Sequence, residues 1–561
     1  MTRSVQIVER MRWMSALAGA AVLALAVSLV LGASSGQLRA PVVSSSSAPA
    51  GSSAPLDPRI ATLAQHHPAS SVQAIVQFNA PVSQARAEAD AGKAHGRIIG
   101  KLPIIHGLAL QITAGQARSL AMNPDVHAVS LNTAVATQSV PNNFHLPMLP
   151  GAHVSSDQLQ TTYDQTLGVT PLWKFGVTGT GVGVAVIDTG VDGALPDFSG
   201  TNGQSRVIVS AVDNAAATSA TDGYGHGTDV AGIIAGNGDN LPASNPLHGQ
   251  YIGVAPNANL ISLKVSDQSG NTTVLDVIYA LQFAVQHQAQ YNIRVINMSL
   301  DSATPQSYKT DPLDAAVEAA WLHGIVVVAA AGNRGTASDA VQYSPANDPY
   351  VITVGGSDEN GSPIPSNDTI ASWSSLGTTQ DGFHKPDVYA PGAHIVSVLA
   401  PGSVFATENC GCTVGNGQYI QTSGTSMAAP AISGLVADLL QIHPGWTPDQ
   451  VKGVLTSPAV NDGSSFQEPN AVKAALVWNP PIADQGIAPS TLLSAANGKV
   501  NPTLATWSLA TWSRATGLLR AGYTQPDKSY DCTTCSAQTG GSVNSSLATW
   551  NLATWTTLPV G

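Results

Sequence analysis

The chain has 561 residues, of which 43% are hydrophobic and only 10% are charged, and its formal net charge is −12. A chain of this length and apolar content can bury one large core or several smaller ones, which excludes general disorder. The sparse acidic surface argues against nucleic acid or an anionic membrane as the main partner. We expect a monomer whose composition suits a secreted protein.

The N-terminal segment has the layout of a secretory signal. Arg3, Arg10 and Arg12 precede an uncharged apolar run over residues 14–33, and small residues follow that run. This order is typical of an exported protein. A retained anchor is the alternative, because about 20 apolar residues can span a bilayer. We therefore expect a signal peptide over residues 1–36 and an extracellular protein, with membrane anchoring through the apolar run as the alternative.

A small domain follows a Ser/Ala/Pro-rich linker at residues 37–55. Within residues 56–133, strand and helix patterns occur in the order βαββαβ, which is typical of a ferredoxin-like α+β unit. The expected elements are a strand at 72–78, a helix at 82–94, a strand pair formed by RIIGKL and HGLALQIT, a helix at 114–122 and a strand formed by DVHAVSL. From 134 to 165 the sequence becomes polar and contains proline, so we expect an exposed linker that is easily cut.

Residues 166–478 alternate short apolar runs with helical patterns. Continuous apolar runs indicate strands that are buried on both faces, and the intervening helices cover them. The expected strands are 182–188, 260–265, 295–300, 324–332 and 350–356, and the expected helices include 274–290 and 311–323. This pattern predicts an α/β fold with a doubly wound parallel sheet, in which ligands and chemistry collect at the carboxyl ends of the strands.

Four polar residues occupy positions suited to catalysis. Asp188 and Asn333 follow buried strands, and His226 and Ser426 each stand at the predicted start of a helix. A hydroxyl at a helix N-terminus lies beside free backbone N–H groups that stabilise developing negative charge, so it suits a nucleophile. Zinc at the histidine is disfavoured, because the i+4 position holds Val230. Each residue alone also has a structural interpretation, as a cap or a buried polar side chain.

Together with their flanks, these residues resemble the subtilisin-like serine proteases, in the order Asp, His, Ser. The matching stretches are VIDTGVD, GHGTDVAG, INMSL, AAAGN, KPDVYAPG and GTSMAAP. The resemblance implies a secreted endopeptidase that needs no cofactor for catalysis. Asp188 would orient His226, which would act as the general base while Ser426 forms an acyl-enzyme. The side-chain amide of Asn333 and the backbone N–H of the serine would hold the oxyanion.

The same resemblance gives a function to the N-terminal unit. The βαββαβ domain at 56–133 looks like the inhibitory propeptide of the family, which assists folding and is then removed by the enzyme itself. The chain would therefore be a self-processing precursor whose partners are protein or peptide substrates and its own propeptide. Cutting would fall in the linker at 134–165, and the doubly wound peptidase domain would follow.

The resemblance also indicates the residues that line the substrate cleft. They are Ser299, Leu300, Asp301, Ala331, Gly332 and Arg334. Asp301 would favour basic substrate residues and Arg334 acidic ones at the position before the scissile bond. We expect the two to neutralise each other and leave a mainly apolar or broad preference, because the pocket residues between them are small and uncharged.

Two further acidic residues stand out against the family pattern. Asp229 stands where many relatives have a histidine, and we interpret it as a favourable charge in the first turn of a helix. Asp197 matches a calcium ligand of the family, although the usual partner loop is replaced by residues 237–251. Structural calcium is therefore an expectation rather than a requirement.

The C-terminal extension, residues 479–561, carries Leu-Ala-Thr-Trp at 504, 509, 547 and 552. This internal repeat either packs its tryptophans on the peptidase domain or binds an external surface. A catalytically inactive protein of the same fold that binds surfaces through these repeats is the alternative function. The four cysteines lie in two local pairs along the chain, Cys410 with Cys412 and Cys532 with Cys535. Disulfide bonds are expected in an exported protein, and the sequence does not assign which cysteines are joined.

Overall fold

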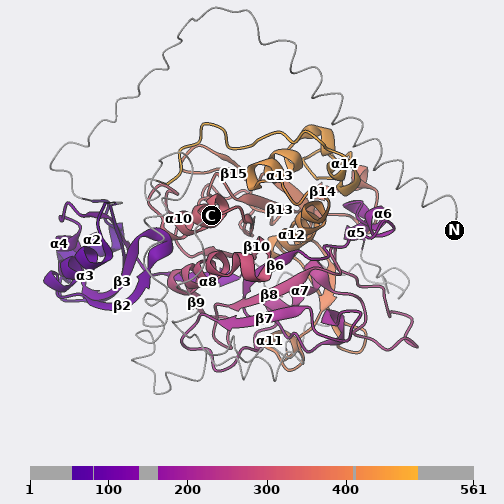
Figure 1. The fold of residues 1–561 in the computed structure, drawn as a ribbon, viewed down its shortest axis with the longest axis horizontal. Coiled ribbons are helices and arrows are strands. Elements are labelled where there is room, and N and C mark those ends of the chain that lie inside the picture. The colour runs from indigo at the N-terminus through magenta and orange to yellow at the C-terminus, as the bar shows by residue number, and fades with distance from the viewer. Residues whose placement is uncertain (1–53, 80, 138–161, 408–411, 491–561) are drawn as a thin grey trace, which may run out of the picture. The chain divides into compact units, whose positions relative to one another are not determined.

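A computed structural model of the chain describes residues 54–79, 81–137, 162–407 and 412–490 (Figure 1). The predicted signal peptide, the Leu-Ala-Thr-Trp repeats and three of the four cysteines lie outside these residues. Cys412 lies within them and is disulfide-bonded. At least one of the expected disulfides is therefore present.

The N-terminal unit is a four-stranded antiparallel sheet with helices, in the strand order β2-β3-β1-β4. Its elements are β1 (Ser71–Phe78), α3 (Gln84–Lys93), β2 (Arg97–Leu102), β3 (Gly107–Thr113), α4 (Ala114–Leu120) and β4 (Val126–Leu131). The predicted βαββαβ order and its ferredoxin-like topology are confirmed. A further helix, α2 (Pro58–His66), precedes them, and Asp57 caps it by accepting a hydrogen bond from the backbone N–H of Arg59.

The main sheet has eight strands in the order β14-β13-β12-β10-β6-β8-β7, with β17 also paired to β13 (Figure 1). All pairs are parallel except β13 with β14. The strands are β6 (Gly183–Asp188), β7 (Val207–Val212), β8 (Asn259–Lys264), β10 (Ile293–Met298), β12 (Val326–Ala330), β13 (Ile352–Asp358), β14 (Thr369–Ile370) and β17 (Val388–Pro391). The predicted parallel α/β sheet is confirmed.

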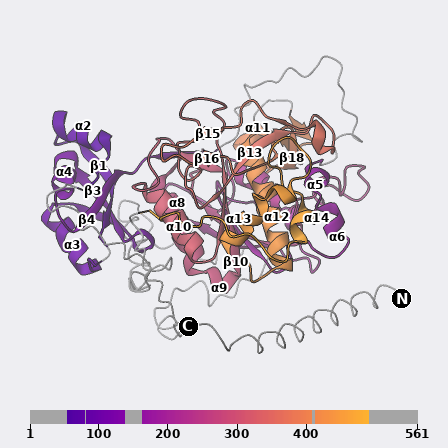
Figure 2. The ribbon, with the colours of Figure 1, turned by 90° about the horizontal axis from the view of Figure 1, so that it is seen from above.

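Helices pack on the sheet in two groups (Figure 2). In one group α7 packs against α12, and in the other α8 packs against α10. The longer helices are α7 (His226–Ala235), α8 (Val274–Gln286), α10 (Pro312–Leu322), α12 (Thr425–Ile442) and α13 (Pro448–Leu455). The short ones are α5 (Tyr163–Thr166), α6 (Thr170–Trp173), α9 (Gln288–Tyr291), α11 (Val404–Thr407) and α14 (Ala471–Ala475). The helix predicted at 274–290 is divided at His287, which ends α8 and begins α9.

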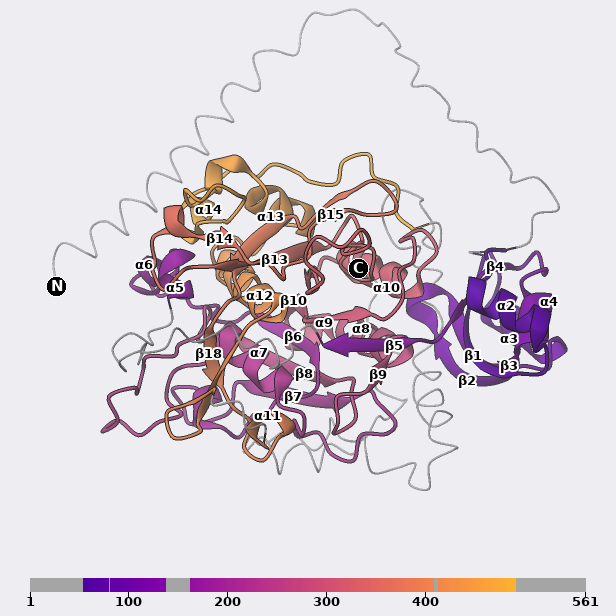
Figure 3. The ribbon, with the colours of Figure 1, turned by 180° about the vertical axis from the view of Figure 1, so that it is seen from behind.

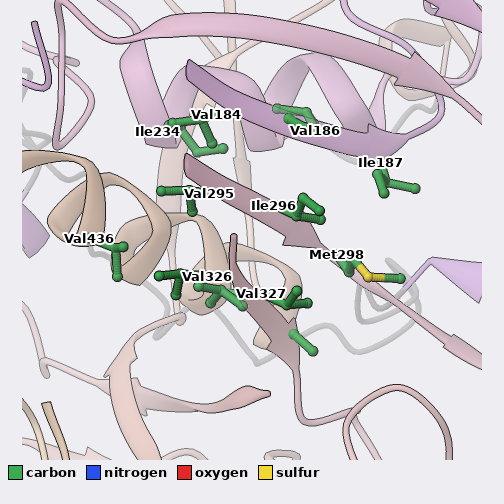
Figure 4. Packing of buried hydrophobic residues seen from close by; sticks show 14 of the residues in the cluster. Val184, Val186, Ile187, Ile234, Val295, Ile296, Met298, Val326, Val327 and Val436 are labelled. Atoms are coloured by element: carbon green, nitrogen blue, oxygen red, sulfur yellow. The ribbon is translucent and has the colours of Figure 1, made fainter. Parts of the chain in front are cut away.

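The core lies between the central strands and these helices. Figure 4 shows side chains of β6, β10 and β12 meeting Ile234 of α7 and Val436 of α12. Among the described residues, α12 is the one helix long and apolar enough to span a membrane. This helix is 89% buried inside the protein, so it forms part of the core.

Strand β5 (Ala134–Thr137) lies in the segment that we expected to be an exposed linker. It forms a three-stranded antiparallel sheet with β11 (Leu300–Ser302) and β9 (Thr272–Thr273), and β5 is the middle strand (Figure 3). Val135 is buried in the main core. The sequence alone could not predict this strand, because four residues carry little periodicity and both partner strands are far away in the chain.

The remaining strands form two small antiparallel groups. They are the pair β15 (Gly377–Thr378) and β16 (His384–Lys385), and the sheet of β18 (Ile395–Val398), β20 (Tyr419–Thr422) and β19 (Thr413–Val414).

Candidate active site

Asp188 and His226 form a buried hydrogen-bonded pair. Asp188 ends β6, His226 begins α7, and the distance from His226 Nδ1 to Asp188 Oδ1 is 2.7 Å. Their exposed fractions are 1% and 0%. Among the described residues, His226 Nε2 has no hydrogen-bond partner. The pair therefore has one imidazole nitrogen fixed by a carboxylate and the other available for proton transfer.

Close backbone packing brings the start of α7 to the end of β6. A Cβ atom at Gly227 would lie 2.2 Å from the carbonyl oxygen of Gly190 and 3.1 Å from Asp188 Cβ, so no other residue fits there without a shift. Gly225, just before the helix, has a φ of 103° that favours glycine. The glycines on both sides of His226 thus allow the histidine to reach Asp188.

Asp222 ties the same two segments together. Its Oδ1 accepts hydrogen bonds from Thr189 Oγ1 at 2.8 Å and from the backbone N–H of Gly225 at 2.7 Å. Its Oδ2 accepts from the backbone N–H of Thr228 at 2.8 Å and from Thr228 Oγ1 at 2.7 Å. Asp222 is buried, so these four bonds hold the turn after β6 against the first turn of α7.

Ser426 is the second residue of α12 and is fully buried. Its Oγ donates a hydrogen bond to the carbonyl oxygen of Ser299 at 3.2 Å, and Ser299 Oγ donates to the carbonyl oxygen of Ser426 at 3.0 Å. Asn297 Nδ2 donates to Ser299 Oγ, and Ser433 Oγ donates to Asn297 Oδ1. This chain of contacts fixes the first turn of α12 against the end of β10.

Asn333 is held beside Ser426 by the neighbouring residue. Its Oδ1 accepts hydrogen bonds from the backbone N–H of Thr425 at 3.0 Å and from Thr425 Oγ1 at 3.1 Å. Thr425 Oγ1 also accepts from the backbone N–H of Gly332 at 3.1 Å. Because the carboxamide oxygen is committed to Thr425, the amide nitrogen is the group that Asn333 can offer as a donor at the start of α12.

The electrostatic surroundings favour a protonated His226. Burial by itself lowers the pKa of the imidazole, but the charge and hydrogen bond of Asp188, together with Asp229 and Asp222, outweigh it and raise the pKa above the ordinary 6.5. A base with a raised pKa accepts a proton more readily, and Asp188 stabilises the imidazolium that results.

Asp229 lies in the first turn of α7, as predicted, but it is completely buried. Thr422 Oγ1 donates to its Oδ2 at 2.9 Å, and burial raises its pKa to about 7. Its place in the first turn of the helix is therefore confirmed, while burial disfavours the full negative charge that we expected there.

Asp301 and Arg334 form the ion pair that the sequence predicted. Asp301 is buried, and the guanidinium carbon of Arg334 lies 3.7 Å from the ring centroid of Tyr343. A Cβ atom at Gly332 would lie 3.0 Å from Arg334 Nη1 and 3.4 Å from Asp301 Oδ2, so the pair borders this glycine directly.

The other predicted cleft residues follow the carboxyl ends of β10 and β12, which are neighbouring parallel strands. Leu300 pairs with Thr137 of β5 and Asp301 pairs with Ala136. The backbone N–H of Ala331 donates to the carbonyl oxygen of Val354 at 2.9 Å.

Hydrogen-bond donors surround Asp197, the predicted calcium ligand. It is buried, and its Oδ1 accepts a hydrogen bond from Tyr419 Oη at 3.3 Å. Burial raises its pKa to about 7, although hydrogen bonds from Tyr419 and from the backbone N–H groups of Asn240 and Gly238 lower it. Ca²⁺ requires oxygen ligands, whereas the neighbours of this carboxylate are hydrogen-bond donors. Calcium at Asp197 stays a prediction from the sequence.

The sequence interpretation missed Asp222 and Lys264. Lys264 ends β8, is fully buried, and donates through Nζ to the carbonyl oxygen of Thr189, next to Asp188. An acidic residue just before a helix start could have indicated Asp222. For Lys264 the signal was a lysine near the carboxyl end of the predicted strand 260–265, where a buried strand leaves little access to solvent.

Comparisons with known proteins agree with this geometry. A model of the Subtilase family matches residues 179–478. Serine protease AprX of Bacillus subtilis (strain 168) is 40% identical over 306 residues, which cover 54% of this chain and 66% of that protein. Subtilisin NAT of Bacillus subtilis subsp. natto is 35% identical over 324 residues, which cover 56% of this chain and 72% of that protein.

A solved structure gives the same result for the fold. Fervidolysin from Fervidobacterium pennivorans, described as a keratinolytic enzyme related to subtilisin, matches with a TM-score of 0.56 and 24% identity. The match covers 78% of this chain and 64% of fervidolysin. The chain thus spans just under two thirds of AprX and of fervidolysin.

Proposed function

Because the chain belongs to the subtilase family of serine proteases, we propose that it hydrolyses peptide bonds through Asp188, His226 and Ser426. The observation that carries this proposal is the buried hydrogen bond of 2.7 Å between His226 Nδ1 and Asp188 Oδ1. It leaves Nε2 as the nitrogen that can take a proton from a serine hydroxyl.

In the proposed reaction, Ser426 Oγ attacks the substrate carbonyl carbon while His226 Nε2 takes the hydroxyl proton. Asp188 keeps the imidazole in the required tautomer and stabilises its positive charge. His226 then gives the proton to the leaving amine. In the second half of the reaction, water attacks the acyl-enzyme while His226 takes its proton, and His226 returns that proton to Ser426 Oγ as the acid product leaves. Ser426 Oγ must first exchange its hydrogen bond to Ser299 for one to His226, and such contacts commonly tighten only when substrate binds.

The developing oxyanion would be held at the start of α12. The Asn333 amide and the backbone N–H of Ser426 are the proposed donors, and the N-terminus of an 18-residue helix adds a favourable dipole. The contacts of Asn333 Oδ1 with Thr425 support this, because they fix the carboxamide before substrate arrives.

We further propose that residues 56–133 act as an inhibitory propeptide. Strand β5, which follows them, pairs with β11 so that Thr137 lies opposite Leu300. The neighbouring Ser299 is the residue whose carbonyl oxygen accepts the Ser426 hydrogen bond. Strand β5 in this position occupies the proposed cleft and excludes substrate. This position supports self-processing in the linker at 134–165.

Export is proposed from the N-terminal sequence, which lies outside the described residues. The disulfide at Cys412 supports it, because disulfides persist in oxidising compartments. An apolar or broad preference at the position before the scissile bond is proposed from the neutral Asp301–Arg334 pair.

The decisive experiment compares the full chain with its Ser426→Ala variant. We expect the parent to shorten itself and digest casein, and the variant to do neither. Ser423→Ala, the same change three residues earlier in the chain, is the matched control and should behave as the parent. If Ser426→Ala still matures and digests casein, the proposed function is wrong.

A further inference from the structure

Two segments that are far apart in the sequence bring three carboxylates together at the end of the main sheet. Asp368 directly precedes β14, and Asp462 and Glu468 belong to the loop between Val460 and α14. One oxygen of each lies within 4.8 Å of one oxygen of the other two. We propose that Asp368, Asp462 and Glu468 bind a Ca²⁺ ion, at a place separate from Asp197.

The hydrogen bonds of these side chains orient them toward a common point. Glu468 Oε1 accepts from Ser357 Oγ at 2.7 Å, and Asp462 Oδ1 accepts from the backbone N–H of Ser464 at 2.8 Å. Glu468 and Asp462 therefore each have one oxygen fixed by a protein donor and the other oxygen left for the cluster.

The oxygens left over are a second, independent indication of a ligand. Asp368 is 6% exposed and Glu468 is 0% exposed. Among the described residues, Glu468 Oε2, Asp462 Oδ2 and both oxygens of Asp368 are buried without any hydrogen-bond partner. Buried polar atoms are normally paired, and an unpaired buried carboxylate is costly, so one bound cation would account for several of these atoms at once.

The chemistry of the site favours a hard divalent cation. Four carboxylate oxygens without donors are ligands that Ca²⁺ prefers, and it completes its six to eight positions with water or backbone oxygens. Asp462 is half-buried, so the cluster lies close to the protein surface. The nearby ammonium of Lys473 donates to the carbonyl oxygen of Asn461 at 2.7 Å and lies at the exposed rim.

Either a bound cation or shared protons would neutralise the three carboxylates, and the experiment below separates the two. A bound ion would clamp the loop of Asp462 and Glu468, which is closed by a hydrogen bond from Asp462 N to the Glu468 carbonyl oxygen at 2.8 Å, onto the end of β13 and β14.

The test uses the full chain carrying Ser426→Ala, so that self-digestion does not interfere and no readout depends on catalysis. The protein is freed of metal with EGTA, and CaCl₂ is titrated by calorimetry while thermal unfolding is followed in parallel. We expect Glu468→Gln to bind one Ca²⁺ fewer per chain than the parent. Saturating Ca²⁺ should raise the parent's unfolding midpoint by about 2–5 °C more than it raises that of Glu468→Gln.

Asp358→Asn is the matched control, because Asp358 ends β13 beside the cluster and accepts a hydrogen bond from Asn360 N instead. It should bind Ca²⁺ as the parent does. The proposal is overturned if the parent binds no Ca²⁺ or if Glu468→Gln retains the parent's stoichiometry. If Glu468→Gln does not fold, Asp462→Asn on the half-buried loop replaces it. The Ca²⁺ stoichiometry and the shift of the unfolding midpoint of that variant then test the proposal.

Discussion

Arg334 forms an ion pair with the buried carboxylate of Asp301, and Tyr343 supports the guanidinium from its ring face. Burial raises the pKa of Asp301 to about 6 even though the hydrogen bond and charge of Arg334 lower it. Each charge thus depends on the other, and their cancellation beside Gly332 gives the proposed pocket rim no net charge.

Breaking this pair should change the substrate preference in a direction set by the residue that remains. Arg334→Met leaves the Asp301 carboxylate alone, so kcat/KM for Arg or Lys before the scissile bond should rise by about tenfold relative to Leu at pH 8. Asp301→Asn should shift the preference toward Asp or Glu. A peptide library that varies this position measures both ratios.

The double variant Arg334→Met/Asp301→Asn is the control for this prediction, and it should return to the apolar or broad profile of the parent. An unchanged profile in both single variants would mean that the pair does not contact the substrate residue before the scissile bond.

Asp188→Asn should remove the orientation of His226 while leaving the fold in place. An amide cannot stabilise the imidazolium, and loss of a triad aspartate costs about 10⁴ in kcat. Steady-state kinetics on a chromogenic peptide measure the loss, and circular dichroism checks the fold. A loss of less than tenfold with an intact fold would exclude the proposed role of Asp188.

Asp229→Asn should extend activity to lower pH. Asp229 is one of the carboxylates that raise the pKa of His226, and catalysis requires the neutral imidazole. Removing this negative charge lowers the His226 pKa, so the acidic limb of kcat/KM moves to lower pH, while kcat at pH 9 changes little. The asparagine can still accept the hydrogen bond from Thr422.

Asp239→Asn removes an exposed carboxylate that does not act on His226 and is the matched control for the pH profile. A shift of the acidic limb to higher pH in Asp229→Asn would contradict the sign of the predicted coupling.

Asp222→Ala should lower both stability and activity. The change leaves the donors of Thr189, Gly225 and Thr228 buried without their acceptor, and such losses cost about 1–3 kcal/mol each when no water replaces them. Urea unfolding in the Ser426→Ala background should show a loss of at least about 2 kcal/mol. Asp192→Ala, which removes only an acceptor 3.4 Å from Ala194 N, should cost far less.

The sequence predicted the parts of the site that depend on local pattern. Asp188 was placed at a strand end because a continuous apolar run precedes it, and Ser426 at a helix start because an apolar helix follows it. The ion pair of Asp301 and Arg334 was also predicted, through the resemblance to a known family.

The sequence could not predict features that arise only when distant segments meet. Strand β7 (VIVSAV) is an edge strand with half-buried positions, and it was not among the predicted strands. Lys264 is fully buried although lysine favours solvent, because the Thr189 carbonyl oxygen accepts a hydrogen bond from its ammonium group and Asp222 and Asp188 offset its charge. A residue that is buried by segments far away in the chain leaves no local pattern in the sequence.

A single methyl group at Gly100 should impair the N-terminal unit as a proposed propeptide. Gly100 lies in β2, and a Cβ atom there would come 1.8 Å from the hydroxyl oxygen of Tyr279 in α8, which is 2% exposed and has little room to move. Gly100→Ala should therefore cost about 1–3 kcal/mol of docking free energy and slow maturation of the full chain.

Gel analysis of maturation over time measures this effect, and two variants define its cause. Gly92→Ala makes the same change in α3, where nothing lies within 4 Å of the added atom, and should mature as the parent does. Tyr279→Phe removes the clashing oxygen, so the double variant Gly100→Ala/Tyr279→Phe should recover most of the rate. If Gly100→Ala matures normally, or if Tyr279→Phe gives no rescue, contact between β2 and α8 does not govern maturation.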